Sequence, residues 1–167
     1  MKKEAAGAHM RLTRYTDYSI RVLVYLAAHP ERRASIGDIS RAYSISQNHL
    51  MKVVHELGKA GYVTTVRGRA GGIRLARPAS EITVGQVVRS MEGGFDLVDC
   101  SSCAIARGCG MTRVLKEAVM AFLAVLDSYT FADIPQQGMD IAAMLRAFQV
   151  PVVPVPEPCA ATLEPDA

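Results

Sequence analysis

Apolar residues recur at helical spacing in three short segments near the start of the chain. The first, 17–28, opens with a threonine and Asp17 that are able to cap it, and a proline stops it. The second, 36–43, follows Ser35 with Asp38 three residues on, an acidic variant of the capping box. The third, 47–60, follows Ser46 and stops at Gly61. Because only a three-residue connection separates the second segment from the third, the pair predicts a helix-turn-helix.

After Gly61 the apolar pattern changes to the period of two that is typical of strands. Residues 62–66 and 73–76 favour two strands, and the basic, glycine-rich segment 67–72 between them favours a turn. Thr83 then leads a fourth helical pattern that ends at Gly93. Three helices and a β-hairpin form a winged helix-turn-helix, so we expect a mainly α fold with a small β-hairpin over residues 10–93.

The second half of the chain predicts one long helix and little other regular structure. Residues 94–110 contain cysteines, glycine and small polar residues and favour a loop. Residues 111–128 are apolar around most of a helical circumference, which predicts a dimerisation helix within a segment 111–134. Residues 135–167 are weakly helical and then proline-rich, as in an extended tail. Residues 1–9 carry no periodic pattern and are expected to be a leader or a cloning remnant.

Charge is distributed unevenly along the chain, whose net charge is +3. Residues 11–90 hold 13 Lys and Arg against 5 Asp and Glu, whereas residues 91–167 hold 4 against 10. The basic half suggests a polyanionic partner such as nucleic acid, although solvated surface charge alone would give the same excess. No stretch reaches the roughly 18 apolar residues of a membrane span, and no signal core follows the first lysines. We therefore expect a cytoplasmic protein without a membrane partner.

Polar side chains at the start of the third helix are candidates for reading DNA, because a recognition helix enters the major groove with its first turn. The hairpin tip adds arginines and glycines suited to phosphates and the minor groove. A phosphate loop of an NTPase is excluded because the tip lacks the lysine and spacing of that motif; polar residues common to any helix start remain an alternative. The expected DNA-binding residues are Ser46, Gln47, Asn48, His49, Lys52, Arg67, Arg69, Gly71 and Gly72.

Three of the four cysteines, Cys100, Cys103 and Cys109, fall within ten residues, and Cys159 lies in the tail. In a reducing compartment such a cluster indicates metal ligands or reactive thiols rather than disulfides. Thiolates select zinc or an iron–sulfur cluster, and both remain open, as do unligated thiols. No catalytic triad, carboxylate pair or HExxH motif is present, so we do not expect an enzyme.

From residue 10 to residue 134 the chain resembles the iron–sulfur winged-helix repressors, and most closely those members that sense nitric oxide. The matching stretches are MRLTRYTDYSIRVLVYLA, SQNHLMKVVHELGKAGYVTTVRGRAGGIRLARPAS, VGQVVRSMEGG, LVDCSSC and LDSYTFADI. The resemblance implies a homodimer that binds an inverted repeat in double-stranded promoter DNA. It also implies an iron–sulfur cluster on Cys100, Cys103 and Cys109, and release of DNA when nitric oxide reacts with it.

The same resemblance makes Asp17 a candidate fourth ligand, delivered from the partner subunit, although Asp17 as a simple helix cap is an equal alternative. The resemblance favours a 4Fe–4S cluster. A 2Fe–2S cluster stays possible, because only two residues separate Cys100 from Cys103, fewer than is common in the family. Two other functions stay open. One is an iron- or redox-responsive regulator of the same fold, and the other is an iron–sulfur electron carrier or redox enzyme.

Overall fold

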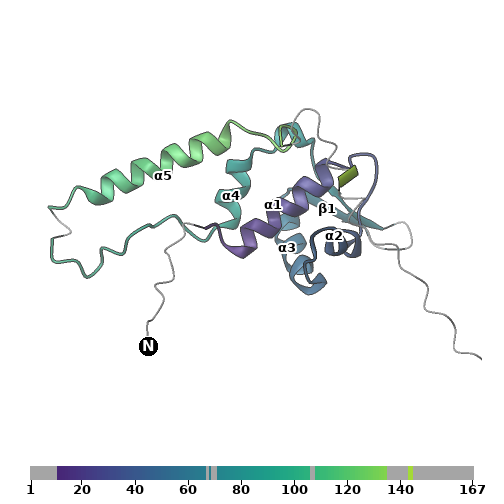
Figure 1. The fold of residues 1–167 in the computed structure, drawn as a ribbon, viewed down its shortest axis with the longest axis horizontal. Helices are drawn as coiled ribbons and strands as arrows, with labels where there is room; N and C mark the ends of the chain where they lie inside the picture. The colour runs from purple at the N-terminus through teal and green to yellow at the C-terminus, as the bar shows by residue number, and fades with distance from the viewer. Residues whose placement is uncertain (1–10, 67, 69–70, 106–107, 135–142, 145–167) are drawn as a thin grey trace, which may run out of the picture.

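The computed structural model describes residues 11–66, 68, 71–105, 108–134 and 143–144 (Figure 1). The expected leader 1–9 and nearly all of the expected tail 135–167 lie outside the described residues, as do Arg67 and Arg69. The elements, in chain order, are α1 (Arg14–Ala27), α2 (Ile36–Tyr43), α3 (Gln47–Lys59), β1 (Val63–Val66), β2 (Gly72–Leu75), a 3-10 turn (Ala79–Glu81), α4 (Val84–Met91) and α5 (Met111–Asp127). The mainly helical fold with one hairpin is confirmed.

Helix α1 begins three residues earlier than the sequence pattern predicts. Thr13 is its N-cap, with an extended ψ of 153° and a hydroxyl that accepts the backbone N–H of Thr16 at 3.2 Å. Asp17 therefore lies inside the first turn, where a negative charge is favourable. The interpretation of Asp17 as a helix cap is wrong.

The next three helices begin where the sequence places them. Ser35 caps α2 and Thr83 caps α4, each in a reciprocal capping box, with Asp38 and Gln86 respectively. Ser46 occupies the N-cap position of α3, but its side chain makes no capping hydrogen bond. The start of α3 thus keeps exposed polar groups that are not used to close the helix.

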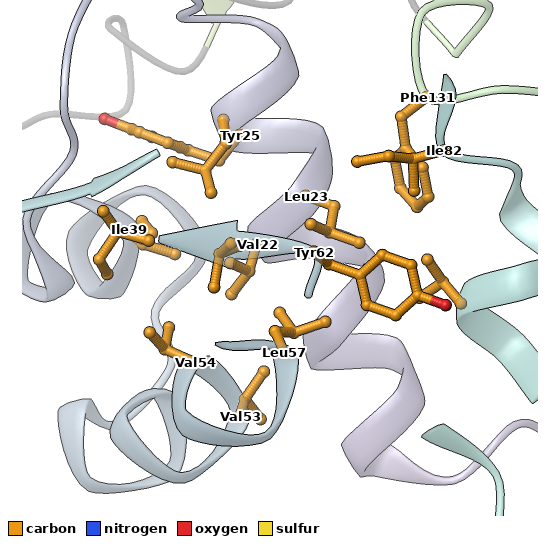
Figure 2. Packing of buried hydrophobic residues seen from close by; sticks show 14 of the residues in the cluster. Val22, Leu23, Tyr25, Ile39, Val53, Val54, Leu57, Tyr62, Ile82 and Phe131 are labelled. Carbon is orange, nitrogen blue, oxygen red and sulfur yellow. The ribbon is translucent and has the colours of Figure 1, made fainter. Parts of the chain in front are cut away.

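The core forms where α1 crosses behind the hairpin and between α3 and α4 (Figure 2). Leu23 of α1 and Leu57 of α3 are fully buried, and the apolar period of each helix places its buried side chains on one face. Ile82 and Phe131 close the core on the side of α4, since both side chains are fully buried. This single core fixes α3 against α1.

The hairpin is antiparallel, with Val63 opposite Leu75 and Val66 opposite Gly72. Ala34 adds a third chain to its edge through a bridge to Ile73. This bridge brings backbone so close that a Cβ on Gly72 would lie 2.9 Å from Cβ of Arg33 and 3.0 Å from the carbonyl oxygen of Ala34. With φ at +149° as well, this position requires glycine.

Helix α5 projects from the body and is anchored through its carboxyl-terminal half, where Val119, Phe122 and Leu126 pack against the core (Figure 1). The chain after it pairs with the start of α4, since Val84 donates to the carbonyl of Tyr129 at 2.9 Å and Phe131 to that of Ile82 at 3.0 Å. Leu123 is the one buried residue of α5. The expected loop 94–110 has no helix or strand in its described residues, 94–105 and 108–110, and leads from α4 to the far end of α5. None of the described helices is long and apolar enough to span a membrane.

Candidate nucleic-acid interface and cysteine loop

The outer face of α3 carries the side chains that the sequence selects for DNA. Leu50, Val53, Val54 and Leu57 face the core, which leaves the intervening positions exposed. The exposed positions on this face and just before it are Ser46, Gln47, Asn48, His49, Met51, Lys52 and His55. Lys52 makes no ion pair with any of the described residues, so its ammonium group is available to a phosphate or a guanine.

Two aromatic residues of α1 support this face from behind. The hydroxyl of Tyr15 donates to the backbone carbonyl of Lys52 at 3.2 Å, and the ring of Tyr18 lies 6.2 Å from that of His49. Sequence reasoning missed both contacts, because half-buried tyrosines that pack against the core do not reveal in the sequence which residues of another helix they meet. They tie the position of α3 to α1, which also carries Asp17.

The glycines at the hairpin tip have different environments, and two of them, Gly71 and Gly72, are expected DNA-binding residues. Gly72 is held against Arg33 and Ala34, so its lack of a side chain serves packing inside the domain. Gly68 is exposed with φ at +107°, as a turn at the tip requires. Gly71 is half-buried, and its N–H donates to the carbonyl of Gly68 at 2.8 Å. The contribution of Arg67 and Arg69 to DNA stays a prediction.

The cysteine loop lies at the free end of α5, away from the α3 face (Figure 1). Cys100, Cys103 and Cys109 are free thiols, with Cys103 exposed and the other two half-exposed. The N–H of Cys103 donates to the carbonyl of Cys100 at 3.3 Å in a tight turn, and Sγ of Cys100 lies 3.5 Å from Oγ1 of Thr112. Hydrogen bonds from Ser101 lower the pKa of Asp99 and keep it charged beside Cys100.

The donor set suits an iron–sulfur cluster or zinc, because three accessible thiols on one irregular segment are able to turn toward a common centre. Within the part of the chain that the structure describes, no three His, Cys, Asp or Glu side chains gather as a metal site. Ligation of one centre by all three cysteines therefore requires the loop to close. Cys159 lies outside the described residues.

Asp17 forms an ion pair with Arg21 of its own helix. Nε of Arg21 lies 3.0 Å from both carboxylate oxygens of Asp17, and the guanidinium stands 5.8 Å from the ring centre of Tyr43 in α2. Burial raises the pKa of Tyr43 to about 12, so this tyrosine is a neutral ring under the cation at any physiological pH. Among the described residues, Asp17 does not join any two cysteines of its own chain in a candidate metal site.

One hydrogen bond links the start of α1 to the residue that precedes the cysteine loop. The backbone N–H of Thr13, the cap of α1, donates to Oε1 of Glu92 at 2.6 Å. Glu92 is the first residue after α4, and the cysteine loop starts directly beyond it. A lone glutamate before two glycines gives no sequence signal of a contact 79 residues away, so sequence reasoning missed it.

Comparison with known proteins gives concordant results. The Rrf2 family, described as iron-dependent transcriptional regulators, matches residues 12–137. The HTH-type transcriptional regulator NsrR of Bacillus subtilis (strain 168) is 49% identical over 143 residues, which cover 82% of this chain and 98% of that protein. This relative is named as a regulator and not as an enzyme, which argues against the electron-carrier alternative.

Two solved structures share the fold. The global cysteine regulator CymR of B. subtilis superposes with a TM-score of 0.60 at 28% identity, over 75% of this chain and 95% of that one. IscR of T. potens superposes with a TM-score of 0.62 at 29% identity, over 74% of this chain and 85% of that one. On the strength of the family match and the NsrR similarity, this chain belongs to the Rrf2 family of iron-dependent transcriptional regulators, as a member of the NsrR type.

Proposed function

We propose that this protein is a homodimeric repressor that binds an inverted repeat in promoter DNA and releases it in response to nitric oxide. The signal is received at an iron–sulfur cluster on Cys100, Cys103 and Cys109. The observation that carries the proposal is the pairing of an exposed polar recognition face on α3 with three accessible thiols at the end of α5. Similarity to NsrR supports the same assignment.

Base reading is assigned to the first turn of α3. Gln47 and Asn48 have the amides that pair bidentately with adenine, and Lys52 has the charge for a guanine or a phosphate. Because Tyr15 and Tyr18 brace this helix from α1, the side chains are presented on a fixed support. Arg67 and Arg69 extend the contact to phosphates or the minor groove at the hairpin tip.

Dimerisation is assigned to α5. Large apolar side chains on this helix are exposed to an extent that a monomer rarely tolerates on one element, and Met120 and Val125 are 58% and 59% exposed. An apolar groove lined by Ile20, Val88 and Phe122 runs between α1, α4 and α5 beside this uncovered surface. A second copy packed along α5 would cover the exposed side chains and place two α3 helices for successive half-sites.

The cluster is assigned to the three cysteines, with Asp17 of the partner subunit as the fourth ligand. The cysteines supply thiolates, and the favoured form is 4Fe–4S, with 2Fe–2S as the other possibility. When bound, the cluster supplies iron that reacts with nitric oxide. A carboxylate is a weaker ligand than a thiolate for such iron, so Asp17 is the ligand most easily exchanged.

Transmission to DNA is assigned to the bonds that join the loop to α1. Closing or opening the loop moves Glu92, and Glu92 holds the cap of α1 through the N–H of Thr13. When the Asp17 carboxylate leaves Arg21, the guanidinium that lies over the ring of Tyr43 in α2 loses its ion-pair partner. Both paths end in the helices that support α3.

The proposal is tested with protein purified without oxygen, by measuring iron, sulfide and visible absorption together with binding to an inverted-repeat promoter fragment. We expect a cluster absorption that shifts or bleaches as nitric oxide is added, with DNA released over the same range. A colourless protein, or one that keeps DNA while its absorption changes, would contradict the proposal.

A second candidate is an iron- or redox-responsive regulator of the same fold, favoured by the description of the family as iron-dependent. In that case iron chelation or peroxide would release DNA at levels where nitric oxide has no effect. The two signals are compared on the same anaerobic preparation, so that one titration separates them.

A further inference from the structure

One large apolar side chain stands in the surface that the proposed function assigns to DNA. Met51 lies in α3, and 51% of it is exposed. Among the described residues from 11 to 93, Met51 and Val66 are the only exposed large apolar side chains. The winged domain thus covers its other large apolar side chains at least in part, and leaves Met51 in water.

Most other exposed apolar side chains lie where a partner is already expected. Ile105 belongs to the cysteine loop and Met120 to α5, the segments assigned to the cluster and to the second subunit. Helices α1 and α4 lie between α3 and α5 (Figure 1). A second copy packed along α5 therefore leaves Met51 uncovered, and a partner for Met51 has to be what α3 itself meets.

Met51 shares the outer face of α3 with the polar residues assigned to base reading. At about 100° per residue, Met51 lies about 40° from Gln47 and about 60° from Asn48 around the helix axis. Lys52 is the next residue, and His55 follows one turn later; both are exposed. Met51 is thus an apolar side chain within a polar reading surface.

The helix itself does not require an apolar residue at this position. Lysine and glutamine have helix propensities close to that of methionine, so either would serve an exposed helical position equally well. A single exposed apolar side chain is common on protein surfaces. Met51 differs because its neighbours on the helix face are the groups that would enter the major groove, where a duplex would cover it.

The major groove offers one apolar group to such a side chain. Thymine carries a C5-methyl group there, and the other three bases present only donors and acceptors. Gln47 and Asn48 have the amides that match adenine, and the pairing partner of each adenine is a thymine. Methionine is unbranched and polarizable, so it adapts its shape to a small apolar group.

The position of Met51 along α3 keeps it within reach of the same few base pairs. It follows Gln47 by four residues, which is about 6 Å along the helix axis. Base pairs stack about 3.4 Å apart, so Met51 faces a pair no more than two steps from the one at Gln47. The hydroxyl of Tyr15 holds the backbone carbonyl of the neighbouring Lys52 at 3.2 Å, which fixes this part of the helix on α1.

We propose that Met51 reads a thymine in each half-site by covering its C5-methyl group in the major groove. The inference rests on the proposed binding of α3 to an inverted repeat and adds a specificity-determining residue to it. Covering one methyl group contributes about fourfold to affinity. Two symmetric half-sites therefore contribute about 15-fold together.

Replacement of thymine by deoxyuridine tests the proposal, because deoxyuridine keeps the base pair and lacks only the methyl group. An inverted-repeat duplex is first selected from a random-sequence pool with the native protein purified without oxygen. Each thymine is then replaced in both half-sites at once, and fluorescence anisotropy measures Kd. We expect one symmetric pair of thymines at which the replacement raises the Kd of the native protein about 15-fold.

Variants of Met51 assign the methyl contact to this side chain. Met51→Ala should bind the thymine and deoxyuridine duplexes with equal Kd, whereas Met51→Leu keeps an apolar side chain and should keep the preference for thymine. Val66→Ala is the matched control, because it shortens the other exposed apolar side chain of the domain. It should leave the ratio of the two Kd values unchanged. Circular dichroism confirms the fold of each variant.

The possible failures are distinguishable. A selected operator at which no deoxyuridine changes Kd would overturn the role of Met51 and leave the proposed DNA binding intact. A preference for thymine that persists in Met51→Ala would also overturn it, since another residue would then cover the methyl group. Failure to select any operator would overturn the proposed function, and this inference with it.

Discussion

Arg89 of α4 and Asp127 of α5 meet through two parallel hydrogen bonds, each 2.5 Å long, at the point where α5 joins the body. Gly85 lies one turn before Arg89, and a Cβ there would stand 2.8 Å from Cγ of Asp127 and 2.9 Å from its backbone nitrogen. The charged pair and the absent side chain together set how closely the two helices approach, and with it the direction in which α5 leaves the domain.

Replacing Gly85 by alanine should destabilise the protein by about 1–3 kcal/mol, because the added methyl group has no space beside Asp127. Urea unfolding of both proteins measures the difference. Gly58→Ala is the matched control in α3, since its Cβ would meet only the carbonyl of Val63 at 3.9 Å. Gly58→Ala should raise the free energy of unfolding by up to about 1 kcal/mol, because alanine has the higher helix propensity. Equal losses of stability in the two variants would contradict the packing argument.

The bridge between Arg89 and Asp127 should make the protein sensitive to acid. The hydrogen bonds from Arg89 hold the pKa of Asp127 below its usual value of 3.8. A carboxylate whose folded pKa is lowered stabilises the protein above its unfolded pKa, and this stabilisation is lost as pH falls through the folded value. The melting temperature of the native protein should therefore exceed that of Asp127→Asn at pH 7, and the gap should close below pH 3.8. A gap that stays constant with pH would show that the charge is not involved.

Removal of the Lys52 charge should weaken binding to every DNA sequence and reduce the slope of log K against log salt by about one for each subunit. Asn48→Ala should instead cost about 1–3 kcal/mol on the preferred operator and relax the choice of base at one position. Fluorescence anisotropy over a salt series measures both. Lys59→Ala serves as the control, because Lys59 lies at the other end of α3 in an ion pair with Glu56 at 3.0 Å. An effect of Lys59→Ala as large as that of Lys52→Ala would contradict the assigned face.

Cys103→Ser should abolish cluster binding and leave the fold intact, because this side chain is exposed and makes no packing contact with the core. Iron and sulfide content together with circular dichroism report the two effects separately. Cys159→Ser is the control and should retain a full complement of iron. If Cys159→Ser lost the cluster as well, the ligand set would have to be revised.

Asp17→Ala should leave the protein folded and weaken its response to nitric oxide. The surface pair with Arg21 contributes only about 0.3–0.5 kcal/mol, so the melting temperature should change little. Arg21→Gln removes the same pair and keeps the carboxylate, which makes it the control. If both variants gave a native cluster spectrum and a native response, Asp17 would have no part in sensing.

The sequence predicts the elements of the winged domain well where caps and periodicity agree. Ser35 and Thr83 mark their helices to the residue, because each has its capping partner three positions later. The sequence places the start of α1 too late, because Arg14 and Tyr15 after the true cap, Thr13, do not begin the apolar pattern, whereas Thr16 and Asp17 directly precede it.

Close approaches between distant segments could not be read from the sequence. Gly72 is an expected contact to DNA, and the structure adds a packing reason for glycine that the sequence does not show, because a Cβ there would meet Cβ of Arg33 and the carbonyl oxygen of Ala34. Gly85 gives no comparable signal, because a glycine in a helical pattern does not reveal which segment packs against it. Residue type and spacing are enough to predict the three cysteines as ligands, since thiolate chemistry depends on residue type more than on the surrounding fold.

The attachment of α5 at one end makes it a lever. Its 17 residues correspond to a rod about 26 Å long, with the cysteine loop at the free end and the Arg89–Asp127 pair as the fulcrum. A rotation of about ten degrees at the fulcrum displaces the free end by about 4–5 Å over that length. The reverse also holds: a displacement of a few ångströms in the loop becomes a modest torque on α4, which a rigid domain can pass on to α1 without unfolding.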